Sequence, residues 1–488
     1  MFFWLNFIIY FPLISAILIW LGCNGKNELA RSLTLSVVTV ETLILVFMYL
    51  SGTFPLNYEA SWMHETLGFN YVLRLDGFSL ALILLTSFLG VISTIVSWER
   101  VKNWGSYGPL LLGTITGLVG VFTAYDLILF YTFWEIMLIP IYFMLSFWGD
   151  KNCKQAAIKF IIVTVFSSLL MLLGLIFLCF IHYAETNEFT LNILDLINSP
   201  IKDVTAAKWI FAAMFIAFAV KIPLFPFHFW APDTYKSGEP GAIILLSGAM
   251  ANAGIYGVIR FCVPLFPQVS SVFVQMGMAL GAFGTVYAAL LAIKQTNIRS
   301  VFAYSSISHM NIIVVAIFTW QIESLNGAAL QLIAHGISIA GLFTIVSMLL
   351  DRNKDGNMQE LGGLFKKMPA LGLVFLVYIV ATIGMPGLAN FTGEALILAG
   401  SFKVSTVWPS LAAISILLSV IYGVRVYGKS MWGPLKNADT STLVLDLNAR
   451  EKAMSAMLII LLFFIGLYPN IVLEPIHNSI ATLMKIGL

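Results

Sequence analysis

The stretch Phe211–Asp233, FAAMFIAFAVKIPLFPFHFWAPD, begins as an apolar helix long enough to enter a bilayer and is then interrupted. Lys221 lies within the apolar run, and Pro223 and Pro226 follow it directly. Proline removes a backbone donor and clashes with the preceding turn. In lipid, the carbonyls freed by such a break are tolerated only inside protein or against water. A lysine beside a break at membrane depth therefore indicates a functional site. The alternative is a kinked helix whose lysine reaches the surface.

The composition around this stretch is that of an all-α polytopic membrane protein. Hydrophobic residues make up 59% of the 488 residues and charged residues 10%, whereas a soluble chain carries about a quarter charged residues. The first apolar run has no basic region before it and no small-residue cleavage site, which predicts a retained helix rather than a signal peptide. The net charge of +2 and the lack of a basic run exclude a nucleic-acid partner. The scattered cysteines are expected to be apolar fillers, with no metal bound: Cys23, Cys153, Cys179 and Cys262.

Long apolar runs predict fourteen membrane helices, separated by mostly short connections. The longer connections are 52–77, with the β-like run NYVLRLDG, the polar segment 183–207, and 429–452, which can hold an amphipathic helix. The expected spans are 3–22, 33–51, 78–97, 108–124, 127–148, 157–182, 208–230, 241–264, 273–293, 299–319, 326–350, 370–400, 407–428 and 453–474.

The basic residues predict the orientation of these helices. Eighteen of the 26 lysines and arginines lie near the loops that follow odd-numbered helices. Cytoplasmic loops carry the excess of lysine and arginine. Both termini are therefore expected on the outer, periplasmic side.

Several titratable residues lie where lipid would exclude charge. Glu135 is in the middle of the fifth helix, where a lone carboxylate favours its neutral form unless it pairs with a cation such as Lys221 on the seventh. Such a pair can switch by moving one proton, or it can be a static ion pair. His309 and His335, on the tenth and eleventh helices, suit a proton relay or a packing role.

Three further polar residues complete the candidate relay. Lys159 is one turn inside the sixth helix, so its amine either takes part or reaches the surface. His228 ends the interrupted stretch of the seventh helix. Asn252 lies at the centre of the eighth helix, which glycines loosen, and Arg260 near its end is expected at the membrane interface.

The twelfth helix repeats the plan of the seventh. It is interrupted at Gly384, Pro386 and Gly387, and Glu394 follows the break. Residues 135 and 221 are 86 apart, and residues 309 and 394 are 85 apart. Matching interrupted segments in two halves indicate inverted repeats, with chance spacing as the alternative. We expect four parts: 1–107 with helices one to three, 108–264 and 265–430 as five-helix inverted repeats, and 431–488 with a polar loop and the last helix.

No G-x-G-x-x-G or P-loop motif is present in the sequence, which argues against nucleotide binding by this chain. No cysteine cluster or paired-histidine haem pattern is present either. The pattern predicts a chain that moves ions and has no redox centre of its own.

Five motifs resemble the antiporter-like subunits of respiratory complex I, which are related to Mrp sodium/proton antiporter subunits, over nearly the full length. GMPGLANFTGE and IYGVIRFCVPLFP resemble the subunit-M type, the mitochondrial subunit 4 type. The motifs are FYTFWEIMLIPIYFMLSFWG, AFAVKIPLFPFHFWAPD, QTNIRSVFAYSSISHMN, QLIAHGISIAGLF and IGMPGLANFTGEALILAGSF.

The resemblance implies roles for the candidate residues. Glu135 would be the helix-five glutamate coupled to Lys221, and Glu394 the helix-twelve group that exchanges protons with the far side. His309 and His335 would be relay histidines. Asn252 departs from the pattern, because the family usually has a lysine there, four residues before the tyrosine of YGxxRF. Water, the histidines or a shifted residue could take over that step, or the pump could be weakened.

The resemblance also implies a function. The chain would be a proton-translocating membrane-arm subunit of an NADH:quinone oxidoreductase, a translocase. NADH, FMN, iron–sulfur clusters and quinone would be bound by other subunits. Antiporter subunits of the L and N types would flank it in the bacterial inner membrane, with the mitochondrial inner membrane as the alternative. A Mrp-type cation/proton antiporter subunit, a membrane-arm subunit of a hydrogenase or ferredoxin-linked complex, and a scaffold with a lapsed channel remain open.

Overall fold

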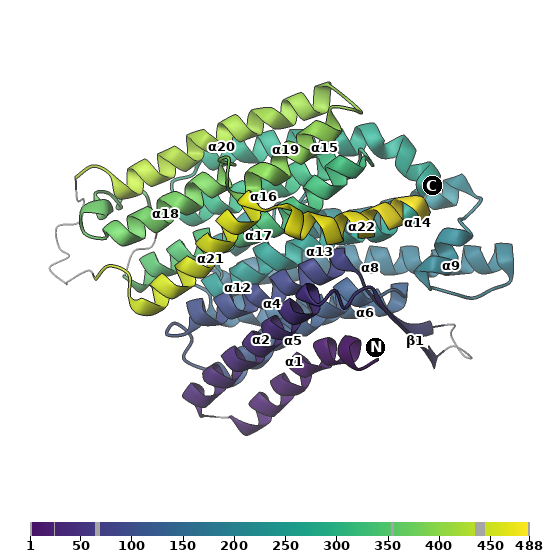
Figure 1. Ribbon diagram of the computed structural model, residues 1–488, viewed down its shortest axis with the longest axis horizontal. Helices are drawn as coiled ribbons and strands as arrows, with labels where there is room; N and C mark the ends of the chain where they lie inside the picture. Colours follow the sequence, from purple (N-terminus) through teal and green to yellow (C-terminus); the bar gives the residue numbers. More distant parts are fainter. Residues whose placement is uncertain (1, 24, 64–68, 353–355, 435–444, 487–488) are drawn as a thin grey trace.

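The computed structural model describes residues 2–23, 25–63, 69–352, 356–434 and 445–486, and these form a bundle of helices with one small β-hairpin (Figure 1). The first part of the chain holds α1 (Phe2–Gly22), α2 (Asn27–Leu50), β1 (Leu56–Met63), β2 (Phe69–Leu75), α4 (Gly77–Ser97) and α5 (Trp104–Thr123). β1 and β2 pair antiparallel, with Tyr58 opposite Leu73. The hairpin confirms the β-like run predicted in 52–77.

The next part holds the interrupted helices. Its elements are α6 (Leu127–Ile136), α7 (Leu138–Trp148), α8 (Cys153–Thr186), α9 (Ile193–Asn198), α10 (Val204–Lys221), α11 (Ala231–Ser237), α12 (Pro240–Leu245), α13 (Ala251–Gly257) and α14 (Val263–Leu265). Two π-helical turns, η1 (Leu246–Met250) and η2 (Val258–Cys262), separate α12, α13 and α14. One continuous span, Pro240–Leu265, therefore carries two π-turns, as its glycine content led us to expect of a loosened helix.

The remaining elements are α15 (Pro267–Lys294), α16 (Ile298–Ile317), α17 (Ile322–Asp351), η3 (Leu364–Lys366), α18 (Pro369–Thr382), α19 (Ala389–Ser401), α20 (Val407–Met431), α21 (Ala449–Leu467) and α22 (Asn470–Ile486). The break between α18 and α19 has left-handed backbone at Gly384 and Gly387, where side chains larger than glycine are strained. This break is the one predicted in the twelfth helix.

Each of the fourteen predicted spans contains helix in the structure. In the described part of the chain, twelve helices are long and apolar enough to cross a membrane, and α21 with α22, bent by 67°, makes up to thirteen. The predicted span 370–400 is the pair α18 and α19. The amphipathic helix considered in 429–452 falls largely on 435–444, outside the described residues.

The structure differs from the predicted spans most clearly at the seventh helix and near the end of the chain. The seventh helix ends at Lys221, not at residue 230, because the prolines that follow cannot continue it. The chain also forms α22, which the spans did not include. Its apolar residues recur at helical spacing among polar ones, so it contains no continuous apolar run by which a span is recognised.

Burial increases toward the middle of the bundle. In the most apolar part of each helix, all residues of the span Pro240–Leu265 and of α17 are buried, as are 94% of those of α16. In α1, α2 and α20, one-third or fewer are buried. The peripheral helices therefore face lipid, and the three inner helices, which carry Asn252, His309 and His335, do not.

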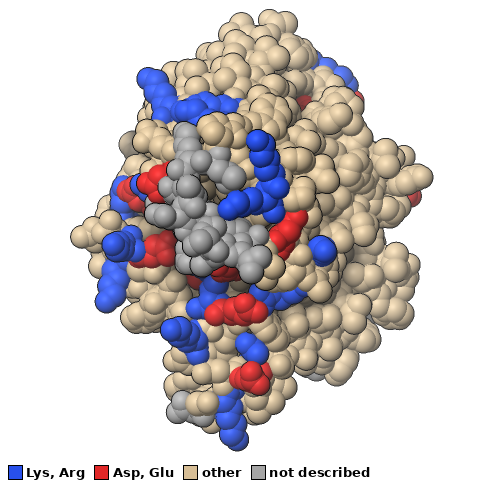
Figure 2. Space-filling model, turned by 90° about the vertical axis from the view of Figure 1, so that its left-hand side faces the viewer, with Lys and Arg blue, Asp and Glu red and all other residues tan. Residues whose placement is uncertain are grey.

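Charged side chains gather at the end of the bundle opposite the hairpin. The hairpin lies at one end, together with the start of α1 and the end of α22 (Figure 1). Figure 2 shows the opposite end, where basic and acidic side chains gather. Ion pairs join neighbouring helix ends at this charged end: Arg100–Asp351, Arg352–Glu451 and Arg450–Glu99.

Candidate functional site

The break in the seventh helix is supported by other parts of the protein. The Trp230 Nε1 donates to the Val220 carbonyl at 2.9 Å. Asn311 on α16 accepts from the Phe225 amide at 3.2 Å and donates to the Pro223 carbonyl at 3.3 Å. Backbone groups freed by the prolines thus have side-chain partners, as membrane depth requires.

Lys221 ends α10 in a buried position, with 2% of its surface exposed. Its Nζ has no hydrogen-bond partner and lies 5.3 Å from the centre of the Trp134 ring and 5.7 Å from that of Phe160. The amine is therefore held against aromatic faces, which attract a cation.

Glu135 and Lys221 do not form a direct ion pair. No contact within 4.0 Å joins them among the described residues, and the Glu135 Oε1 is buried without a partner. Glu135 is nonetheless nearby, because the residue beside it in α6, Trp134, has its ring centre 5.3 Å from the Lys221 Nζ. It lies in the last turn of α6, just before the break at Met137. The two groups are neighbours whose contact requires a movement.

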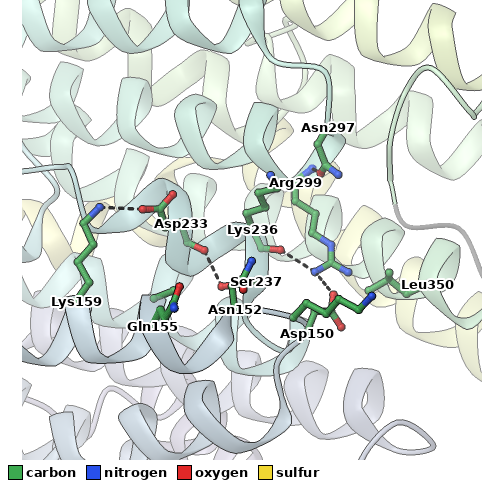
Figure 3. A pocket seen from close by; sticks show the side chains of 12 residues that line it. Asp150, Asn152, Gln155, Lys159, Asp233, Lys236, Ser237, Asn297, Arg299 and Leu350 are labelled. Carbon is green, nitrogen blue, oxygen red and sulfur yellow. Dashed lines mark hydrogen bonds and ion pairs between the residues drawn. The ribbon is translucent and has the colours of Figure 1, made fainter.

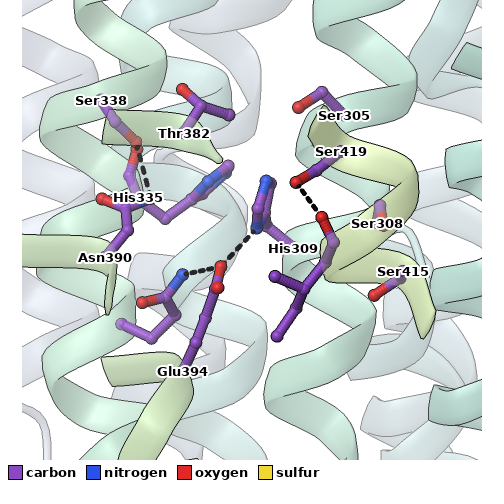
Figure 4. Close-up of polar contacts among 12 residues, drawn as sticks. Ser305, Ser308, His309, His335, Ser338, Thr382, Asn390, Glu394, Ser415 and Ser419 are labelled. Carbon is purple, nitrogen blue, oxygen red and sulfur yellow. Dashed lines mark hydrogen bonds and ion pairs between the residues drawn. The ribbon is translucent and has the colours of Figure 1, made fainter. Parts of the chain in front are cut away.

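The corresponding residues of the second half are in direct contact (Figure 4). The Nδ1 of His309 on α16 lies 3.1 Å from the Oε1 of Glu394 on α19. Gln331 on α17 donates its amide to the same Oε1 at 3.3 Å. The Nε2 of His309 is 3.5 Å from the Tyr422 hydroxyl, which is 2.9 Å from the Ser305 hydroxyl.

His335 lies beside this pair. The centres of the His309 and His335 rings are 5.7 Å apart, and the Nε2 of His335 lies 3.0 Å from the Ser306 hydroxyl. The Nδ1 of His335 is buried without a partner. Figure 4 shows both imidazoles turned toward the space between α16, α17 and α19.

Asn252 lies between the two halves. It is fully buried on α13 and donates to the carbonyls of Gly248, at 2.9 Å, and of Leu332 on α17, at 3.3 Å. Its Oδ1 has no partner. Gly248 and Gly336 let the backbones of these helices approach closely, because a Cβ on either would be within 3.1 Å of the carbonyl of the other. Asn252 is therefore tied to the helix that carries His335.

Lys221, Asn252, His335, His309 and Glu394 are thus buried on five helices of the bundle centre: α10, α13, α17, α16 and α19. We call these five residues the central polar row. α10 packs against α13, and α17 against both α16 and α19. Asn252 joins α13 to α17 through the Leu332 carbonyl, and His309 lies between His335 and Glu394.

Lys159 lies outside the central polar row. Its Nζ pairs with Asp233 at 2.8 Å, and both side chains are exposed, by 39% and 63%. The pair lines a polar cavity of about 960 Å³ at the charged end, together with Arg299, which is bound to Asp150 at 2.6 Å (Figure 3). Of the two alternatives for Lys159, this position is the one in which its amine reaches the surface.

His228 is buried in the break, with its ring centre 5.5 Å from that of Tyr287 and its Nδ1 without a partner. Among the described residues, no hydrogen bond joins it to Lys221. Arg260, expected at the interface, lies near the hairpin end of the bundle, where it is buried in an ion pair with Asp76, the residue that caps α4, at 2.5 Å.

The sequence did not single out some polar partners of the row. Gln331 is four residues before His335, so it shares a helix face with that histidine, and this spacing could have identified it. Ser306, Tyr422 and Asn311 carry no comparable signal. Glu41 on α2 is buried with both oxygens unpartnered, away from the row.

In the described part of the chain, no group of three or more histidine, cysteine, aspartate or glutamate residues is placed to hold a metal ion. The arrangement is instead a row of titratable and polar side chains within a helical bundle. Side chains of these types are able to pass protons between hydrogen-bonding groups.

The profile of the NADH:quinone oxidoreductase/Mrp antiporter transmembrane family matches residues 124–421, the part of the chain that carries the whole central polar row. The chain belongs to this family. NADH-quinone oxidoreductase subunit M of Escherichia coli is 34% identical to it, over 99% of this chain and 97% of that protein.

Solved structures of family members share the fold. A chain of respiratory complex I from Thermus thermophilus, solved with bound NADH, has a TM-score of 0.90 and 26% identity, and the match covers 99% of this chain and 100% of that one. A chain of the Mrp complex from a Dietzia species has a TM-score of 0.86 at 20% identity, over 99% and 98% of the two chains, so its likeness is one of fold.

Proposed function

We propose that the chain is a proton-translocating, subunit-M-type membrane subunit of an NADH:quinone oxidoreductase. Electron transfer from NADH to quinone in other subunits would drive protons through it. The observation that carries the proposal is the central polar row, four buried titratable side chains and the amide of Asn252, on helices of both halves of the bundle. Relatives named as subunit M of this oxidoreductase support the same function.

In this proposal, Lys221 and Glu394 are the terminal proton-binding groups of the row. Lys221 gains a proton as Glu135 moves toward it and loses the proton as Glu135 moves away, because a nearby carboxylate stabilises the ammonium. The proton then passes Asn252. Its amide does not titrate, but it orients a hydrogen-bonded water molecule that carries the proton. His335 and His309 then deliver it to Glu394, with which His309 is already in contact.

The expected orientation of the helices sets which side of the membrane each end of the bundle would face. The charged end of the bundle would face the cytoplasm and the hairpin end the outside, as the excess of lysine and arginine predicts. The membrane would be a bacterial inner membrane, with both termini outside. Moving one charge against the membrane potential requires about 2.3 kcal/mol per 100 mV, so the redox reaction must supply this energy at each stroke.

The partners are also part of the proposal. The chain would lie between antiporter-like subunits of the L and N types in the membrane arm. FMN, iron–sulfur clusters and quinone would be bound by other subunits. The two halves of the row would belong to inverted repeats at 108–264 and 265–430, and the paired breaks at 222–230 and 383–388 support that division.

The test uses the assembled complex in proteoliposomes. Glu135→Ala and Lys221→Ala should abolish proton pumping by this subunit while NADH oxidation continues at a reduced rate. The measurement is the number of protons moved per electron. Phe229→Ala, at an exposed position of the same break, is the matched control. A normal ratio in both charge variants would refute the proposal.

The second candidate is a cation/proton antiporter subunit of the Mrp type. The observation in its favour is that the same family profile covers both kinds of protein. The two candidates differ in what drives transport. Pumping that requires NADH and quinone supports the first, and cation/proton exchange in membranes without electron flow supports the second.

A further inference from the structure

Two arginines at the hairpin end take no part in the central polar row. Arg260 is buried, with 2% exposure, and lies 2.5 Å from Asp76 at the start of α4. Its guanidinium carbon lies 5.3 Å from the centre of the Tyr256 ring, and its Nε has no hydrogen-bond partner. A buried guanidinium nitrogen without a partner is costly, which leaves this group short of hydrogen-bond acceptors.

Arg74 on β2 lies close to this group. Its guanidinium carbon is 5.1 Å from the centre of the Tyr125 ring. Among the described residues, no carboxylate forms an ion pair with Arg74. Arg74 and Arg260 line the same cavity. Asp76 is the one acidic residue in its described lining, so two guanidinium groups share one carboxylate. The local charge is positive and favours an anion.

These side chains line a cavity of about 280 Å³. Its far wall is α22, which runs toward the hairpin end (Figure 1) and contributes Asn478, Ser479 and Thr482. A planar guanidinium with paired N–H donors matches the oxygens of a phosphate group. The cavity thus offers the fork of Arg74 and the positive charge of Arg260, whose Nη2 already donates to Asp76 and Ser79, with hydroxyl and amide groups opposite them.

A second cavity, of about 570 Å³, forms a groove among α2, α4, α17 and α21. Its lining is almost wholly apolar, and two of its wall residues, Leu50 and Ile460, are 78% and 64% exposed, so the groove opens to the lipid. This volume is within the range of cavities that hold small ligands. The apolar side chains along its walls include Val46, Leu84, Phe88, Ile337, Met457 and Leu461.

The polar cavity and the apolar groove lie next to each other at the start of α22. Tyr49 lines the groove, and its ring centre is 6.1 Å from that of Phe54, which lines the cavity. The Tyr49 hydroxyl donates to the carbonyl of Ile471 at 2.6 Å. Ile471 lines the groove and Pro475 the cavity, one helical turn apart, or about 6 Å along the axis.

We propose that the cavity and groove together form a phospholipid site. The phosphate diester would lie between Arg74 and Arg260, and an acyl chain would run down the groove from Tyr49 toward the bilayer centre. Burial of the chain against apolar side chains supplies affinity, and the two guanidinium groups supply the preference for a phosphate. The exposed Glu474 does not line either cavity. The site joins α22 to the hairpin and to α2, three elements outside the central polar row.

The test measures lipid bound to the full-length chain, purified with the subunits that remain attached to it. The delipidated protein is incubated with phosphatidylglycerol, with a diacylglycerol of the same chains, or with inorganic phosphate, and retained ligand is counted by native mass spectrometry. Arg74→Gln removes one fork, and Val46→Trp fills the groove. Lys202→Gln and Leu43→Trp are the matched controls, because both residues are outside the two cavities.

We expect one tightly retained phosphatidylglycerol in the parent protein. Arg74→Gln should lower its retention about tenfold, as the loss of a charge-assisted hydrogen bond predicts. Val46→Trp should abolish it, and the controls should retain it. Equal retention of diacylglycerol, full displacement by inorganic phosphate, or equal retention in all five proteins would each overturn the proposal. Proton pumping is not the readout, so this result is independent of the proposed function.

Discussion

The imidazole Nδ1 of His309 lies 3.1 Å from the Oε1 of Glu394, and both side chains are buried. The corresponding residues of the first half, Glu135 and Lys221, have nearly the same sequence separation but no direct contact among the described residues. One half therefore holds its acid and base together while the other holds them apart.

The contact between His309 and Glu394 should appear as a coupling in a double-mutant cycle. His309→Gln and Glu394→Gln should each lower the number of protons pumped per electron, because each removes one proton-binding group. The double variant should lose little more than the worse single variant, since the two groups act as one unit; couplings between contacting residues are about 0.5–3 kcal/mol. Strictly additive losses would contradict a shared role.

The position of Glu394 depends on the close packing of α17 and α19. A Cβ on Gly393 would be 2.4 Å from the Gln331 Oε1 and 3.0 Å from the Gln331 Cα. Gly393→Ala should therefore displace Gln331, which donates to Glu394, and should lower pumping without removing any titratable group. Pumping stoichiometry checks this.

Gly428→Ala is the control for that substitution, because a Cβ there would meet nothing closer than 3.6 Å. It should leave pumping unchanged. Unchanged pumping in Gly393→Ala would mean that Gln331 does not position the Glu394 carboxylate.

Much of the fold could be predicted because membrane spans are continuous apolar runs, and each of the fourteen expected runs contains helix. The break after Lys221 was also predictable, because two prolines encode it locally. α22 was not predicted, because its apolar residues alternate with polar ones and form no continuous apolar run. The contact of Gln331 with Glu394 depends on how α17 packs against α19, and the separation of Glu135 from Lys221 depends on how α6 ends. Neither relationship can be predicted from one segment of the sequence alone.

The two lysines considered for the relay should behave differently. Lys159 is exposed and paired with Asp233, and such surface pairs contribute about 0–1 kcal/mol. Lys159→Ala should therefore leave both stability and proton stoichiometry close to those of the parent protein, whereas Lys221→Ala should abolish pumping. Proton-to-electron ratios in proteoliposomes measure the difference. A loss of pumping in Lys159→Ala as large as that in Lys221→Ala would place Lys159 within the pathway.

Asn252 provides a test of whether the row is continuous. Its amide is bonded to two carbonyls, and its Oδ1 faces the buried interior. Asn252→Leu keeps the volume but removes every hydrogen bond, so pumping should fall. Asn252→Lys should not increase the protons pumped per electron, because the row already functions through the amide. A gain in Asn252→Lys would favour a lapsed channel.

The ion pair of Arg260 with Asp76 should contribute strongly to stability, because both side chains are largely buried, with 3% and 15% exposure. Arg260→Met leaves the Asp76 carboxylate without its cation and should cost about 3–5 kcal/mol. Adding Asp76→Asn should recover part of this loss, since the uncompensated charge is then gone. The midpoint of thermal unfolding of the purified protein measures both. Arg450→Met, which breaks the exposed pair with Glu99, is the control and should cost at most about 1 kcal/mol. Equal losses of stability in Arg260→Met and Arg450→Met would show that the buried pair stabilises the protein no more than the exposed pair does.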